Sequence, residues 1–83
     1  MVTKDTTLNE LFESACLSAD TIVQPGENFR VKDLFRGVEW SRIPKGFRTK
    51  LGGMFFAYVK GEAKNAFEPV GKTPQNQQIY VKK

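Results

Sequence analysis

One stretch of this 83-residue chain constrains its fold more than any other. Within it, large apolar side chains recur every four residues, at Phe47, Leu51, Phe55 and Val59. Because an α-helix turns once in 3.6 residues, this spacing predicts an amphipathic helix over residues 45–60. The opposite face has two unusual features, Gly52-Gly53 in the middle of the helix and Phe56 among polar residues.

Weaker patterns predict the remaining elements of a single domain over residues 1–83. After a flexible N-terminus (residues 1–6), Thr7 and Glu10 form a capping box that opens a first helix over residues 7–18. The apolar and polar alternation in Phe29-Arg30-Val31 predicts a short strand at residues 29–31. A second, short helix follows at residues 32–37, and Gly37 ends it. Three apolar residues after that helix are expected in the core, namely Val38, Trp40 and Ile43.

The C-terminal segment predicts a β-hairpin over residues 66–81. Its polar middle, residues 71–76, has almost nothing to bury and reads as a loop. The flanking arms hold apolar residues that are expected to pack on the core, namely Phe67, Val70, Ile79 and Val81. Pro69 lacks a backbone donor, so the first arm is expected at a sheet edge.

Composition argues against several classes of protein. The single cysteine, Cys16, cannot form an internal disulfide, and without histidine a His-dependent nucleophile or general base is excluded. A zinc site would have to be built from carboxylates, so we expect no metal, no cofactor, no catalytic residues and no enzyme. No apolar run reaches the roughly 20 residues of a spanning helix, and no signal peptide is visible. We therefore expect a cytoplasmic protein without a membrane partner.

Charge is unevenly distributed along the chain. Residues 1–33 hold six acidic and three basic residues, whereas residues 34–83 hold three acidic and ten basic ones. Such asymmetry is typical of a polyanion-binding surface, although it also occurs in proteins that bind only other proteins.

The order of these elements resembles a winged helix-turn-helix domain, an α+β fold with three helices, a C-terminal β-hairpin (the wing) and a short additional strand. FRVKDLF resembles the strand and second helix, FRTKLGGMFFAYVKG the recognition helix, and VGKTPQNQQIYVKK the wing. The string LF-x-G-x-EW-x-x-IP-x-G-x-R-x-x-LG-x-x-F-x-x-x-V, residues 34–59, is also similar to a family of small uncharacterised proteins of Gram-positive bacteria and their mobile elements.

The resemblance implies a small, sequence-dependent duplex-DNA-binding protein, a regulator of transcription or replication on a phage, plasmid or other mobile element. The recognition helix would contribute Lys45, Arg48, Thr49, Lys50 and Lys60. The wing would contribute Lys72, Thr73, Gln75, Asn76 and Gln77, with added charge from Lys82 and Lys83. A planar guanidinium can read guanine with two bonds, which suits Arg48, and Thr49 could meet a thymine methyl group.

Two questions stay open at this point. Gly52 and Gly53 either let the helix backbone approach the duplex or pack closely on a neighbouring helix. A homodimer or a protein partner could be contacted through Phe56 or through the first helix, with Leu8, Leu11 and Phe12. The alternative function is a protein-binding module, an adaptor or inhibitor of a host nucleic-acid enzyme on the same scaffold, and the exposed aromatic Phe56 favours it.

Overall fold

In the computed structural model, which describes residues 5–83, helix α3 (Lys45–Lys60) has the bounds that the apolar spacing predicts. It begins after Pro44 and ends at Gly61, whose backbone amide donates to the carbonyls of Ala57 and Tyr58. The predicted apolar face is inward, since Leu51, Phe55 and Val59 are at most 1% exposed. The four-residue spacing therefore identified the central helix of the core.

Helix α1 (Leu8–Thr21) begins at the predicted capping box. The Thr7 side chain accepts from the Glu10 amide, and the Glu10 carboxylate accepts from the Thr7 amide. The predicted end at residue 18 is wrong, because Ala19 is fully buried and continues the inward face of the helix for another turn. Of the apolar residues expected to face a partner, Leu11 is buried, and Leu8 and Phe12 pack against the core.

The second helix lies later in the chain than predicted. Residues 32–37 do not form it: Val31–Leu34 make a single 3₁₀ turn, η1, and α2 (Gly37–Arg42) begins at Gly37, which was expected to end a helix. The turn is closed because the Asp33 carboxylate accepts from the Arg30 backbone amide, at 2.9 Å.

Helix α2 is covered on one side only. Phe35, just before it, is buried against Trp40, which is itself half-buried, and Ile43 after it is 2% exposed. Val38 is 64% exposed, so its predicted place in the core is wrong. With only six residues, this helix turns Val38 to solvent while Trp40 reaches back to Phe35.

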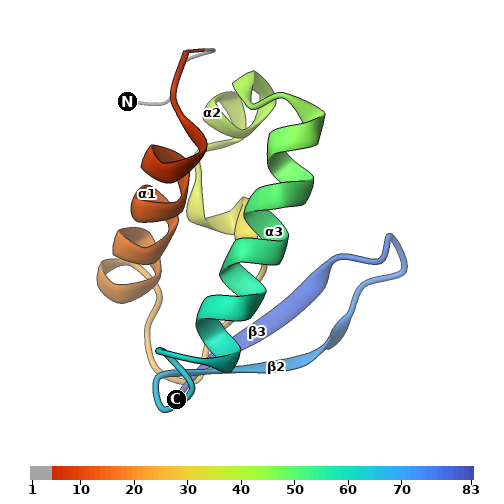
Figure 1. Cartoon of the computed structure of the whole chain (residues 1–83). Coiled ribbons are helices and arrows are strands. Elements are labelled where there is room, and N and C mark those ends of the chain that lie inside the picture. Colours follow the sequence, from red (N-terminus) through yellow and green to blue (C-terminus); the bar gives the residue numbers. More distant parts are fainter. Residues whose placement is uncertain (1–4) are drawn as a thin grey trace.

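Three antiparallel strands form one sheet in the order β1-β3-β2 (Figure 1). They are β1 (Asn28–Phe29), β2 (Phe67–Lys72) and β3 (Gln78–Lys82), so the short strand begins one residue earlier and ends two residues earlier than predicted. The hairpin between β2 and β3 is confirmed, and Pro69 lies in the edge strand β2, as expected. The described residues thus form an α+β domain with three α-helices and a three-stranded sheet.

The inward face of the hairpin differs from the prediction. Tyr80 is 1% exposed and packs with Phe29 and Phe55, whose rings also contact Phe67, whereas Ile79 and Val81 are only half-buried. Tyr80 pairs with Phe29 across the sheet, and this register turns the tyrosine toward α3. Val70 is 50% exposed because the pairing shifts between Pro69 and Gly71 and leaves it outside the ladder.

The arrangement of the elements leaves the hairpin partly free. Helix α3 lies across the sheet and contacts α1, while the loop end of the hairpin extends beyond α3, away from the C-terminus (Figure 1). Over residues 5–83, none of the helices has the length and apolar character needed to cross a membrane.

Candidate nucleic-acid interface

A groove of about 690 Å³ lies between α3 and the loop end of the hairpin. Its other lining residues come from η1, the residue before it, α2 and β3. The groove brings together most of the residues that the sequence assigned to DNA, namely Lys45, Arg48, Thr49, Lys72, Gln75, Asn76 and Gln77. Helix α3 and the loop end of the hairpin, which are separated by more than ten residues of chain, thus form one concave surface.

The charges along this groove have one sign. Its basic residues are Arg30, Lys32, Lys45, Arg48 and Lys72, and the described residues that line it include no aspartate or glutamate. Arg30 and Lys32 were missed by the sequence analysis, because they belong to the part of the chain with an acidic excess. No local sequence signal identifies them, because they approach the hairpin only through the pairing of β1 with β3.

The Arg48 side chain is held against α2. Its guanidinium carbon lies 5.5 Å from the centroid of the Trp40 ring, and Nη2 donates to the Ser41 carbonyl at 3.3 Å. Its Nε is buried and has no hydrogen-bond partner. One of the nitrogens expected to read a base, Nη2, is therefore already bonded within the protein.

The remaining predicted helix residues differ in their positions. Lys50 is exposed, but neither it nor Lys60 lines the groove. The Lys60 Nζ lies 5.8 Å from the centroid of the Phe56 ring, at the C-terminal end of the helix. The Thr49 hydroxyl donates to the Lys45 carbonyl at 3.3 Å, so it is bonded within the helix.

The hairpin loop, residues 73–77, is closed by its own hydrogen bonds. The Asn76 amide donates to the Thr73 carbonyl and the Gln77 amide to the Thr73 hydroxyl. Pro74 fits the second position of this turn, and Asn76 has the positive φ, 66°, that asparagine tolerates better than most residues. Thr73 does not line the groove, and it shapes the loop instead.

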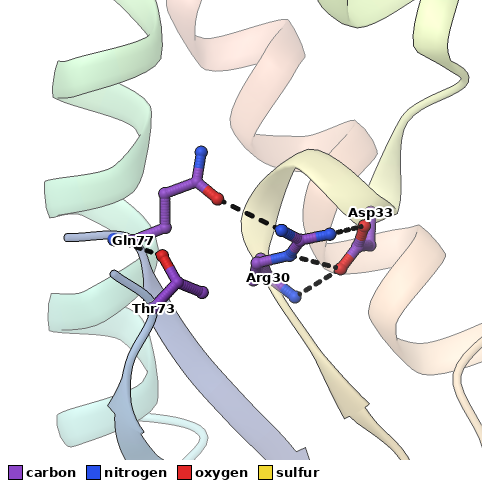
Figure 2. A network of polar contacts seen from close by, with 4 residues as sticks. All are labelled: Arg30, Asp33, Thr73 and Gln77. Atoms are coloured by element: carbon purple, nitrogen blue, oxygen red, sulfur yellow. Dashed lines mark hydrogen bonds and ion pairs between the residues drawn. The ribbon is translucent and has the colours of Figure 1, made fainter. Parts of the chain in front are cut away.

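A polar network ties this loop to the body of the protein (Figure 2). Arg30 Nη1 donates to Gln77 Oε1 at 3.3 Å, while Nε and Nη2 donate to the two Asp33 oxygens at 3.1 Å. Burial alone would raise the pKa of Asp33, but the hydrogen bonds from Arg30 outweigh it and lower that pKa below its ordinary value. Gln77, predicted to contact DNA, thus anchors the loop.

The two mid-helix glycines do not pack on a neighbouring helix. A Cβ atom placed at Gly52 or at Gly53 would meet no heavy atom within 4 Å. Gly52 lines the groove, and Gly53 does not. Of the two readings that the sequence left open, close helix packing is therefore wrong.

The last two lysines lie away from the loop. Lys82 Nζ donates to the carbonyls of Ala19, Asp20 and Val23, at 3.1, 2.9 and 2.8 Å, and so caps the C-terminal end of α1. Lys83 Nζ donates to the Lys64 carbonyl at 2.9 Å. Their predicted contribution to the charge of the hairpin tip is wrong, because β3 runs from the loop back to α1.

These features define a small α+β domain with a basic groove between its longest helix and a β-hairpin. The chain belongs to the family described as domain of unknown function (DUF1413), which matches residues 13–82. No curated protein and no solved structure matches the chain.

Proposed function

We propose that this protein is a small winged helix-turn-helix protein that binds duplex DNA through the basic groove. The observation that carries the proposal is the lining of that groove, with basic residues from α3, η1 and the hairpin and no acidic residue among the described lining residues. Closely spaced cations on a concave surface attract a polyanion, and phosphate neutralisation supplies most of the affinity in non-specific DNA binding. The element order, with the hairpin directly after α3, supports the winged-helix assignment.

Within this proposal, the side chains have different roles. Lys32, Lys45 and Lys72 contact phosphates, while Gln75 and Asn76 at the loop tip can donate to phosphates or to groove acceptors. The network around Arg30 fixes the loop relative to η1 before DNA arrives, which reduces the entropy lost on binding.

The single tryptophan provides a direct assay, because Trp40 lines the groove. We expect a random-sequence duplex to change Trp40 fluorescence, and the affinity to fall by about ten-fold or more between 50 and 200 mM salt. The double variant Lys45→Gln, Lys72→Gln should weaken binding. It should also make the salt dependence shallower, with a slope of log K against log salt concentration that is smaller in magnitude by about 2.

The matched control is Lys64→Gln, Lys83→Gln, which removes the same charge at the C-terminal side of the molecule, outside the groove. It should leave the affinity and the salt slope close to those of the unsubstituted protein. An equal loss in both double variants would show that net charge, rather than the groove, governs binding and would refute the site.

The protein-binding module is the second candidate, and the exposure of Phe56 favours it. This ring is 39% exposed within the groove, and exposed aromatic residues often anchor protein interfaces. Absence of any duplex binding at 50 mM salt would reject the first proposal and leave this one.

A further inference from the structure

We infer that the groove binds DNA at an unpaired nucleotide, whose base stacks on Phe56 above the open backbone of Gly52. The inference rests on the proposed function, since it takes DNA as the ligand of the same groove. It adds the structural class of DNA that the groove prefers, a duplex interrupted by at least one unpaired base.

The lining of the groove combines two kinds of side chain. Some are apolar or aromatic, namely Val31, Trp40, Phe56 and Tyr80, and among these four Phe56 is the most exposed. Most of the others are basic residues and amides. An intact duplex presents phosphates and base edges, and it keeps the faces of its bases stacked inside. In DNA, only an unpaired base offers a flat apolar face together with a phosphate, and this combination matches an exposed aromatic ring among basic and amide side chains.

The space required is present beside Phe56. Gly52 lies one helical turn before it, and side chains on a helix lean toward the N-terminus, so the ring leans toward the Gly52 position. A Cβ atom at Gly52 would meet nothing within 4 Å, so this part of the groove is open. The groove volume, about 690 Å³, falls in the range of roughly 300–1,000 Å³ that is typical of small-ligand sites.

Polar groups around this space suit the rest of the nucleotide. Lys60 does not line the groove, but its Nζ lies 5.8 Å from the Phe56 ring centroid and places a cation beside the aromatic ring. Across the groove, Gln75 and Asn76 are exposed and carry amides that can both donate to and accept from a base edge. Gln77 and Gln78 are less suited, because their side chains already bond Arg30 and the Gly71 and Ile79 carbonyls.

The test compares three ligands of one sequence: a plain duplex, the same duplex with one extra unpaired nucleotide, and a single strand. Affinities are measured at fixed salt from Trp40 fluorescence and from the anisotropy of labelled DNA. We expect the interrupted duplex to bind about ten-fold more tightly than the plain one, as one stacked base provides. Phe56→Leu should abolish this preference, whereas Phe56→Tyr, which keeps an aromatic face, should retain it.

The two glycines supply a matched pair of variants. Gly52→Ala fills the open space and should reduce the preference, while Gly53→Ala adds the same methyl group outside the groove and should not. Both changes favour the helix, so neither result can be attributed to unfolding.

The outcomes separate this inference from the proposed function. Equal affinity for plain and interrupted duplexes overturns the stacked base and leaves duplex binding intact, and so does a preference that survives Phe56→Leu. Tight binding of the single strand with a weakly bound plain duplex supports the stacked base and overturns the duplex proposal. No binding to any of the three ligands overturns both.

Discussion

Replacing Lys82 by methionine tests whether this lysine stabilises the fold rather than binding DNA. Methionine keeps an unbranched stem but removes the ammonium that bonds three carbonyls at the end of α1, at 2.8–3.1 Å. A hydrogen bond to a charged group contributes about 1.5–3 kcal/mol, and a cation at a helix C-terminus about 0.3–1 kcal/mol. The three bonds share one charge, and water can replace the more exposed one, to Asp20, so they do not add fully.

We therefore expect Lys82→Met to lower the free energy of unfolding by about 2 kcal/mol, which corresponds to a fall in Tm of about 10 °C for a domain of this size. Urea unfolding followed by circular dichroism measures the change, with an unchanged m-value if the transition stays two-state. Lys83→Met is the control, since it removes a single exposed bond to the Lys64 carbonyl and should change stability by less than about 0.5 kcal/mol. Equal stability of the two variants, or a Lys82→Met protein that folds normally but loses duplex affinity, would refute this role.

Two further predictions concern titrating groups. Burial raises the pKa of Tyr80 from 10.0 to about 12, so folding favours the neutral phenol. The resulting contribution to the free energy of unfolding is on the order of 2 kcal/mol. It is complete below pH 10 and is lost as pH rises through about 12. Urea unfolding at rising pH should show the loss in the unsubstituted protein and a much smaller one in Tyr80→Phe. The pKa of Asp33 is lowered in the folded protein, so its carboxylate contributes to the free energy of unfolding at pH values above the ordinary pKa of 3.8. This contribution is lost as pH falls through the lower pKa of the folded state. Asp33→Asn removes the anion that orients Arg30, so at neutral pH the NMR order parameters of residues 73–77 should fall, and unchanged values would show that the loop does not need this network.

The sequence predicted the elements whose signals are local. The four-residue apolar spacing gave both ends of α3, and Thr7 with Glu10 gave the start of α1. The position of α2 was predicted wrongly because this helix has six residues, no side-chain cap and no buried residue of its own, so its formation depends on the packing of its neighbours. Alternation along β3 separated its two faces correctly but could not identify the inner one, which depends on the pairing of Tyr80 with Phe29 in a distant strand.

The same dependence on register decides which basic residues can reach the groove. Lys72 pairs with Gln78 near the loop, whereas Lys82 pairs with Phe67 at the other end of the hairpin, so two lysines of one hairpin lie a strand length apart. Conversely, Arg30 enters the groove from a segment with an acidic excess, because β1 joins the hairpin through β3. A count of charges along the chain therefore includes a lysine that caps α1, Lys82, and omits an arginine that positions the loop, Arg30. Strand pairing thus decides which of the basic residues outside α3 reach the positive surface.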